Sequence, residues 1–256
     1  EIGAMARLGA MTESTDIHPL IAEAAAKVAS SLIRNNATLG GNLCVDTRCF
    51  WFNQSEDWRR SIDWCHKEDC GTGSDCRVIP NQNTLCVATY QGDLAPSLMV
   101  LEGVLHLIGP HGSREVPAED FFQLDGITRN VLQEGEFVLK VTFPENVSSR
   151  VGSYHKLRVR ESWDFPEAGI SAAWIPGDNS TLRVASTALE SIPRLHSEQV
   201  AELSEKFSTN NVTALSESVM KSIKPVNNTA LPPRYRRAMV KVLAKRSLNK
   251  ILEATE

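Results

Sequence analysis

All six cysteines of this 256-residue chain lie within one stretch of 43 residues, from Cys44 to Cys86. Thiolates bind soft metal ions and iron–sulfur clusters, so this stretch is the part of the sequence best equipped for metal chemistry. It begins directly after Gly40-Gly41-Asn42, a glycine pair of the type that lets backbone amides approach a phosphate. The two features together predict cofactor chemistry.

The cysteines alone leave three interpretations open. Disulfides suit a secreted protein, but the other 213 residues contain no cysteine and can form a core without cross-links. A structural zinc site usually shows closely paired cysteines, whereas the gaps here are 4, 15, 4, 5 and 9 intervening residues. An iron–sulfur cluster also needs four thiolates and tolerates irregular spacing in a loop. The aromatic residues between Phe50 and Trp64 either shield such a cluster from water or form a plain core.

Composition indicates an ordinary globular protein, with 42% apolar and 23% charged residues. The net charge of -4 gives no electrostatic reason to wrap nucleic acid, and no stretch reaches the roughly 18 apolar residues of a membrane span. We therefore expect neither nucleic-acid binding nor a membrane span. The chain starts at Glu1 without a basic-then-apolar leader, and we expect a cytoplasmic location.

Hydrophobic patterns predict two α+β modules around these groups. A helix over 18–34, with Asp16 as its cap, leads into the glycine turn. Strands are expected over 98–101, 104–108, 137–143, 152–159, 169–175 and 182–187. The last segment, 234–254, predicts an amphipathic helix whose cations form a solvated face. The boundary between the two modules is expected near 145–150.

Three segments carry a family resemblance: Ile33-Arg34-Asn35-Asn36-Ala37-Thr38-Leu39-Gly40-Gly41-Asn42-Leu43, Gly92-Asp93-Leu94-Ala95-Pro96-Ser97-Leu98 and Tyr154-His155-Lys156. They resemble the signatures of the FAD-binding subunit of molybdenum hydroxylases, the family of xanthine dehydrogenase and carbon monoxide dehydrogenase. The resemblance runs nearly end to end. It implies an α+β protein, in which an FAD-binding domain of the PCMH type precedes a carbon monoxide dehydrogenase flavoprotein C-terminal-like domain.

The resemblance also implies domain boundaries. The FAD-binding domain is expected over 1–147 and the C-terminal α+β domain, a three-stranded antiparallel sheet plus helices, over 148–256. Family members carry an earlier subdomain whose glycine-rich loop holds the FAD pyrophosphate. We therefore expect this chain to be truncated, with the N-terminal FAD-binding subdomain missing.

The cysteines fall in an insert relative to most of the family. Asn42 and Asp93 are 51 residues apart, and the excess, about 44–90, contains every cysteine. An insert in this place resembles that of the beta subunit of 4-hydroxybenzoyl-CoA reductases, whose extra loop holds a 4Fe-4S cluster. The resemblance implies four ligands, Cys49, Cys65, Cys76 and Cys86.

Two cysteines are then spare. Cys44 belongs to the glycine turn and is interpreted as a small buried hydrophobic residue. Cys70 lies in a segment that is slightly longer than in the family. The choice between Cys70 and Cys76 as the third ligand therefore stays open.

The glycine turn has its own chemistry. Thr38 offers a hydroxyl, Gly40 and Gly41 offer unshielded backbone amides, and Asn42 offers a side-chain amide, a set suited to phosphate or ribityl oxygens. Alone, the triplet is more typical of a simple left-handed helix stop.

The resemblance adds Asp93, Val138 and Lys156 as positions that contact FAD, and this combination favours a flavin site. Without the resemblance, Asp93 would be a turn residue before Pro96, and Lys156 a solvated strand lysine. No catalytic acid, base or nucleophile is assigned in this chain.

The implied function is electron transfer within a molybdenum enzyme of the 4-hydroxybenzoyl-CoA reductase type. Electrons would pass from ferredoxin or another low-potential donor through the 4Fe-4S cluster and FAD toward a molybdopterin-binding large subunit, beside a small subunit with two 2Fe-2S clusters. Aromatic degradation in an anaerobic organism is the expected setting. One alternative is the FAD subunit of an oxidative molybdenum hydroxylase, for xanthine or another heterocycle. An alternative of another class is a zinc-stapled binding protein without a redox role.

Overall fold

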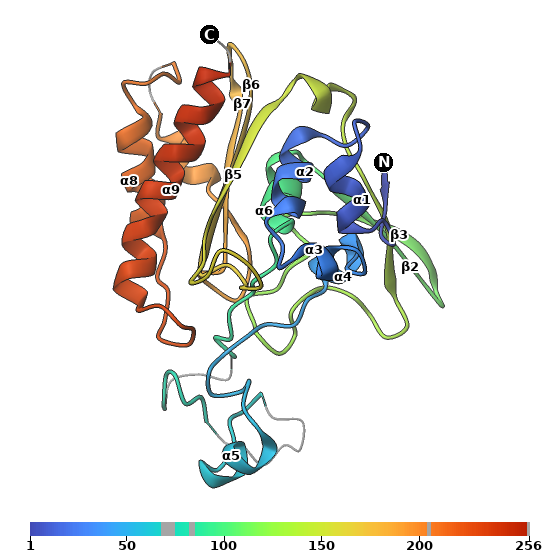
Figure 1. The fold of residues 1–256 in the computed structure, drawn as a ribbon, viewed down its shortest axis with the longest axis vertical. Helices are drawn as coiled ribbons and strands as arrows, with labels where there is room; N and C mark the ends of the chain where they lie inside the picture. The colour runs from blue at the N-terminus through green and yellow to red at the C-terminus, as the bar shows by residue number, and fades with distance from the viewer. Residues whose placement is uncertain (68–74, 82–84, 204–205, 255–256) are drawn as a thin grey trace.

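Two antiparallel sheets of four strands organise the structure, a computed structural model that describes residues 1–67, 75–81, 85–203 and 206–254. Their strand orders are β1-β4-β2-β3 and β5-β6-β7-β8. Figure 1 shows the second sheet in the middle of the molecule, with helices on both of its faces and the first sheet on the far side of one helical layer.

The first sheet and its helices come mostly from the N-terminal half. Its strands are β1 (Ile2–Gly3), β2 (Val104–Gly109), β3 (Gly112–Pro117) and β4 (Phe137–Thr142). The associated helices are α1 (Leu8–Glu13), α2 (Pro19–Ala26), α3 (Ser31–Arg34), α4 (Leu39–Leu43) and α6 (Ala95–Val100). Between α4 and α6 lies the cysteine-rich insert, which contains the short helix α5 (Glu56–Ser61).

The second sheet follows a short 3-10 helix, η1 (Glu145–Ser149). Its strands are β5 (Val151–Leu157), β6 (Ala168–Ile175), β7 (Asp178–Thr187) and β8 (Arg194–Leu195), and its helices are α7 (Ser197–Ala201), α8 (Val212–Ser222) and α9 (Pro233–Glu253). The expected three antiparallel strands are thus present, and the two-residue strand β8 adds a fourth at the edge.

Strand β6 explains why helices cover both faces of the second sheet. Successive strand side chains point to opposite faces. Ile170 and Ala172 belong to the hydrophobic cluster that includes α8 and α9, whereas Ala173 belongs to the cluster that includes α2 and α6. Because both faces are buried, β6 is apolar along nearly its whole length.

The strand predicted over 98–101 is wrong, because these residues belong to helix α6 and its C-terminal cap. Pro96 lies in the first turn, where proline favours helix, and all six residues of α6 are buried. A helix that is buried all round has no polar face, so its sequence shows no helical period. A short apolar run of this kind cannot be told from a buried strand.

The helix predicted over 18–34 is interrupted. It divides into α2 and α3, because Ala29 adopts a positive φ of 40° and Ser30 caps a new helix by accepting a hydrogen bond from the Ile33 amide at 3.5 Å. The expected cap Asp16 is also wrong. His18 caps α2 instead, with Nδ1 accepting from the Leu20 amide at 3.2 Å.

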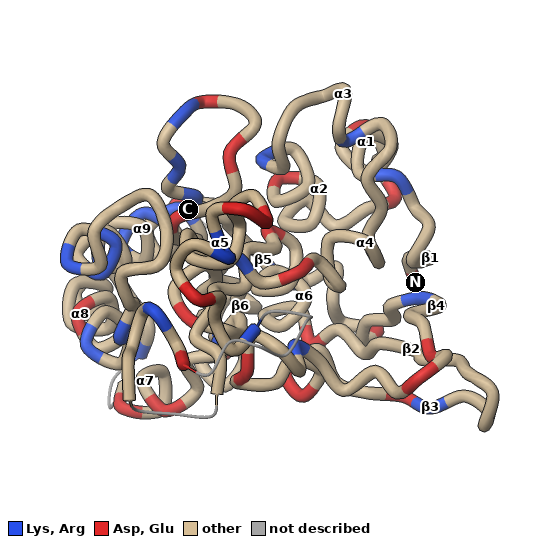
Figure 2. Tube along the Cα trace, turned by 90° about the horizontal axis from the view of Figure 1, so that it is seen from below, with Lys and Arg blue, Asp and Glu red and all other residues tan. Residues whose placement is uncertain are grey.

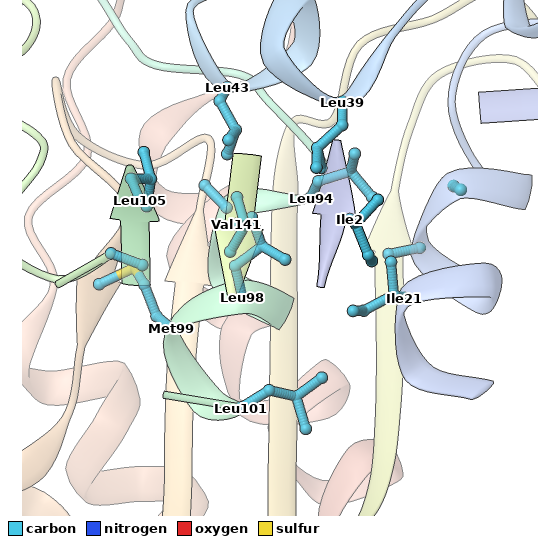
Figure 3. Packing of buried hydrophobic residues seen from close by; sticks show 14 of the residues in the cluster. Ile2, Ile21, Leu39, Leu43, Leu94, Leu98, Met99, Leu101, Leu105 and Val141 are labelled. Carbon is cyan, nitrogen blue, oxygen red and sulfur yellow. The ribbon is translucent and has the colours of Figure 1, made fainter. Parts of the chain in front are cut away.

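The first hydrophobic cluster anchors the glycine turn. Leu39 and Leu43, one turn apart in α4, are fully buried and point toward Leu94 and Leu98 of the α6 region (Figure 3). Burial of each leucine side chain contributes about 1.5–3 kcal/mol. The opposite side of α4, which carries Gly41, stays exposed.

The cysteine-rich insert forms a lobe that projects from the two sheets, at the bottom of Figure 1. Its two arms pair where they leave the body, because the Arg48 amide donates to the Thr89 carbonyl at 2.8 Å and the Thr89 amide returns a bond at 2.7 Å. Asn228, before α9, donates to the Val87 carbonyl at 2.7 Å and accepts from the Phe50 amide at 2.9 Å. The lobe is therefore tied to the second sheet's module.

Charged residues of both signs are interspersed along the chain (Figure 2). On α9, the predicted solvated cations form ion pairs, Lys250 with Glu23 at 2.7 Å and Lys241 with Glu217. None of the helices in the described ranges has both the length and the apolar character to cross a membrane.

Candidate functional site

The glycine turn is the first turn of a helix. Thr38 caps α4, and its Oγ1 accepts from the Gly41 amide at 3.1 Å. The interpretation as a left-handed helix stop is wrong, because Gly40 and Gly41 lie inside α4 and neither has a positive φ. The Gly40 amide donates to the Ala4 carbonyl at 2.8 Å. Both amides, predicted to face a phosphate, therefore have acceptors within the protein.

The two glycines differ in the space around them. A Cβ atom on Gly41 would meet only Thr38 Oγ1, at 3.2 Å, whereas a Cβ atom on Gly40 would meet Ala4 Cβ at 3.0 Å and the Ala4 carbonyl oxygen at 3.2 Å. The Gly40 position therefore has little room for a side chain, because Ala4, the residue after β1, packs against it. Gly41 leaves an open surface that a ligand can approach closely.

Asn42 joins the turn to the second predicted motif. Its Oδ1 accepts from the Leu94 amide at 3.0 Å, and its carbonyl accepts from the Tyr90 hydroxyl at 3.1 Å. The Gly92 position is too crowded for any side chain, since a Cβ atom there would lie 2.7 Å from the Asn42 carbonyl oxygen. The structure therefore brings Gly40-Gly41-Asn42 and Gly92-Asp93 together although 51 residues separate Asn42 from Asp93.

Asp93 lies in a buried hydrogen-bond network. Its Oδ1 accepts from the Tyr154 hydroxyl at 2.8 Å and its Oδ2 from Lys156 Nζ at 3.1 Å, and Lys156 also donates to the Lys27 carbonyl at 2.9 Å. The side chains of Asp93 and Lys156 are 3% and 2% exposed. Burial raises the pKa of Asp93 and lowers the pKa of Lys156, and their mutual attraction opposes both shifts. The two residues predicted to contact FAD thus bind each other.

Val138, the remaining residue predicted to contact FAD, lies in β4 and is 6% exposed. It pairs with Leu107 of β2 and belongs to the first hydrophobic cluster. Its side chain packs in the core, whereas Thr38, Gly40, Gly41 and Asn42 form one short segment. The structure brings that segment close to Asp93 through the Asn42 and Leu94 contact.

Four cysteines line one cavity in the insert. Cys49, Cys65, Cys76 and Cys86 are each 6–8% exposed, and all four line the same cavity. The pKa of Cys49 is raised to about 11 and the pKa of Cys86 to about 12, mainly by burial and to a smaller extent by neighbouring cysteines of the set. The cavity also contains His66, whose buried Nε2 has no hydrogen-bond partner among the residues that the structure describes. Its other lining residues are Phe52, Lys67, Arg77, Val78, Val87 and Ala88.

Backbone hydrogen bonds hold the cysteines in place. The Cys49 amide donates to Asn53 Oδ1 at 2.8 Å, and the Cys86 amide donates to Asp125 Oδ1 at 2.9 Å. Next to Cys65, the Trp64 carbonyl accepts from Arg77 Nε at 2.8 Å. These partners lie up to 39 residues away from the cysteine they support. The sequence did not indicate that Asp125 supports Cys86, because the two residues are 39 positions apart.

The spare cysteines are separate from this cavity or outside the described residues. Cys44 is half-buried, packs against the first hydrophobic cluster and has its pKa raised by burial, in agreement with its interpretation as a small hydrophobic residue. Cys70 lies outside the residues that the structure describes. Within the described ranges, His, Cys, Asp and Glu residues form no group of three or more placed to hold a single metal ion.

A wider cleft of about 480 Å³ adjoins the cysteine cavity at Cys49. The Arg48 guanidinium lies 4.4 Å from the centre of the Phe165 ring in this cleft, a cation–π contact. Arg160 and Asp164, which form an ion pair, and buried Glu167 belong to its wall. The cleft could not be predicted from the sequence, because its walls come from three distant segments, the insert, the β5–β6 connection and the segment before α9.

Residues 1–146 match the family model for the FAD binding domain in molybdopterin dehydrogenase. The chain belongs to this family. It is similar to the aldehyde oxidoreductase FAD-binding subunit PaoB of Escherichia coli K12, with 27% identity over 71% of this chain and 61% of that protein. It is also similar to the carbon monoxide dehydrogenase medium chain of Hydrogenophaga pseudoflava, with 24% identity over 97% of this chain and 75% of the other.

Solved structures show the same fold. Carbon monoxide dehydrogenase from Hydrogenophaga pseudoflava, in a form that lacks the Mo-pyranopterin moiety of its cofactor, superposes with a TM-score of 0.72 at 22% identity, over 98% of this chain and 74% of that one. Quinoline 2-oxidoreductase from Pseudomonas putida 86 gives a TM-score of 0.71 at 16% identity, over 98% and 74%. The predicted fold class is therefore confirmed. The chain spans about three-fifths of PaoB and three-quarters of these two structures.

The glycine turn has an explanation in the family, because it lies within the matched FAD-binding domain. The family description does not in the same way account for the cysteines. The match ends at residue 146 and includes α4, Asp93 and the insert between them. The role of the four-cysteine cavity rests on its own chemistry.

Proposed function

We propose that this chain is the electron-transfer subunit of a molybdenum enzyme, with FAD at the glycine turn and a 4Fe-4S cluster in the insert. The observation that supports this most strongly is the cavity lined by four buried cysteine side chains from four separate segments of the insert. Four thiolates are the usual ligand set of a 4Fe-4S cluster. The cluster ligands would be Cys49, Cys65, Cys76 and Cys86.

The donor set of the cavity fits such a group. A cluster holds its ligand sulfurs further apart than one zinc ion does, since Zn–S bonds of about 2.3 Å bring four sulfurs around a single point. The four thiols line one cavity. The unpartnered Nε2 of His66 lies in the same lining, where it can donate a hydrogen bond to a sulfur. Phe52 and Val78 exclude water from the cavity.

The flavin would lie against the exposed side of α4. Thr38, Gly40, Gly41 and Asn42 form its proposed surface, with the open Gly41 position allowing close approach. Asp93, Val138 and Lys156 would support this surface from behind, because their described contacts are with the protein. When bound, FAD and the cluster supply the redox chemistry, and the residues of this chain bind them, orient them and exclude water.

We further propose the organisation of the complex. Residues 1–147 would form the second FAD-binding subdomain, with the insert at about 44–90, and residues 148–256 the C-terminal domain. Partners would be a molybdopterin-binding large subunit and a small subunit with two 2Fe-2S clusters. Ferredoxin or another low-potential donor would deliver electrons at the insert, as in 4-hydroxybenzoyl-CoA reductases. We also propose a cytoplasmic location, where cysteine thiols stay reduced.

A second candidate function is supported by the relatives. Their names describe an aldehyde oxidoreductase, a carbon monoxide dehydrogenase and xanthine dehydrogenases, which oxidise their substrates. The chain would then be the FAD subunit of an oxidative hydroxylase that carries the same insert. The direction of electron flow separates the two functions.

The test compares Cys65→Ser with Cys44→Ser in the assembled complex. Cys65→Ser should lose most of the iron, because serine replaces a thiolate that iron prefers, and reduction by a low-potential donor should fail. Oxidative turnover with artificial acceptors should continue slowly. Cys44→Ser should keep iron and both activities, because Cys44 packs against the first hydrophobic cluster and does not line the cysteine cavity.

Three outcomes contradict the proposal. Full iron content in Cys65→Ser would remove this residue as a ligand. Equal losses in both directions would make the insert a part of the active site or of subunit assembly. A large change in substrate dissociation constant would have the same meaning, because no substrate contact is assigned to this chain.

A further inference from the structure

Lys67 is a buried cation in the lining of the four-cysteine cavity. Its side chain is 7% exposed, although lysine is almost never buried without a specific reason. It follows Cys65 by two residues in the cysteine-rich insert. The structure therefore contains a charge at the cavity that the cysteine pattern did not predict.

The ammonium group is held in one position. Nζ donates to Thr47 Oγ1 at 2.6 Å, to the Thr47 carbonyl at 2.9 Å and to Asp46 Oδ1 at 2.8 Å, which uses all three of its protons. Thr47 is itself fixed, because its Oγ1 donates to the Gly126 carbonyl at 2.6 Å and the residue is 1% exposed. The Phe52 ring lies 4.8 Å from Nζ. Lys67 is thus preorganised rather than free to leave for solvent.

The positive charge of Lys67 is only partly cancelled. Its counterion Asp46 is 49% exposed and also pairs with Arg129 at 3.1 Å, so water and a second cation screen the carboxylate. Arg77, the other cation of the lining, is 28% exposed and binds the Trp64 and Asp63 carbonyls.

We propose that Lys67 is a positioning residue whose fixed positive charge raises the reduction potential of the redox group held by the four cysteines. This inference rests on the proposed function, because it requires a cluster in the cavity. Reduction adds one electron, and hence one negative charge, to a group that four thiolates already make anionic. A buried cation stabilises the added charge strongly, because the surrounding protein screens it far less than water does.

The test is a mediated redox titration of the anaerobically purified full-length protein, followed by electron paramagnetic resonance of the reduced cluster. Lys67→Met removes the charge and keeps most of the volume. We expect it to lower the equilibrium constant for reduction at least tenfold, which is 59 mV for one electron. Lys67→Arg keeps the charge and should shift the potential much less. The matched control is Arg60→Met in α5, whose side chain is 64% exposed and which should titrate with the unchanged protein.

A second variant keeps the test decisive if Lys67→Met fails to load iron. Asp46→Asn leaves the ammonium in place and removes its exposed counterion, so the potential should rise. The inference is overturned if iron-loaded Lys67→Met titrates with the unchanged protein, or if Asp46→Asn leaves the potential unchanged. Absence of iron from the unchanged protein is a different result, because it contradicts the proposed function itself.

Discussion

Asp93 illustrates how a residue's neighbours in sequence can conceal its role. Its motif predicted a contact with FAD, yet its carboxylate oxygens accept hydrogen bonds from Tyr154 and Lys156 of β5. The first module and the second sheet therefore meet at a buried ion pair. A flavin at the glycine turn would depend on Asp93 through the position of this segment.

We expect Asp93→Asn to lower the free energy of unfolding by about 3–5 kcal/mol, because it leaves the Lys156 ammonium buried without a counterion. Urea denaturation of the full-length protein measures this change. Glu56→Gln in the exposed pair with Arg60 is the control and should cost less than about 1 kcal/mol. Iron content should survive Asp93→Asn, while FAD content should fall. Equal, small effects of the two substitutions on stability would rule out a structural pair.

At the scale of the element, helix α4 has one side that packs in the core and an opposite side that a ligand can approach. Leu39 and Leu43 fix one side of the helix in the core (Figure 3), and Gly41 lies on the exposed side. The neighbouring Gly40 touches Ala4. The two glycines therefore offer a matched pair of substitutions within one turn.

Gly41→Val should weaken FAD binding strongly while changing the free energy of unfolding by less than about 1 kcal/mol, because valine tolerates a helix at least as well as glycine does. Gly40→Val should instead destabilise the protein by about 1–3 kcal/mol through overpacking against Ala4. Flavin fluorescence after denaturation and urea unfolding measure the two effects. Unchanged FAD content in Gly41→Val would mean that the turn does not approach the cofactor.

The elements also show what the sequence can predict. Strands β2, β4, β5 and β7 and helix α9 match predicted segments, because alternation or a one-sided apolar stripe marked each of them, and β6 matches as a short apolar run. Helix α6 was missed since burial on all sides removes the period, and the break before α3 depends on one positive φ at Ala29. Local pattern therefore predicts amphipathic elements, whereas a short apolar run can belong to a buried strand such as β6 or to a buried helix such as α6.

The residues of the site also divide into those that the sequence indicates and those that only tertiary contacts place there. The resemblance implied that Cys49, Cys65, Cys76 and Cys86 form one set, and these are the cysteines that line the cavity. Lys67 and Asp125 could not be predicted, because each reaches its position through tertiary contacts. The role of Cys70 lies outside the described residues.

At the scale of the whole molecule, the insert projects from the body but is not independent of it (Figure 1). Two residues of the second module bind the insert. Asn228 donates to the Val87 carbonyl in one arm and accepts from the Phe50 amide in the other, and the Ser191 hydroxyl donates to the Cys86 carbonyl at 3.0 Å. Asp125 binds the Cys86 amide from the first module. The cysteine cavity is therefore held by both halves of the chain.

The metal and flavin content of the full-length protein, purified without oxygen, tests the central claim most directly. Four thiolates around a 4Fe-4S cluster predict about four irons and about four acid-labile sulfides per chain, together with one FAD and a brown colour that fades on reduction. A colourless protein with about one zinc ion per chain and no iron would contradict the account, because the same cysteines would then form a structural zinc site without a redox role.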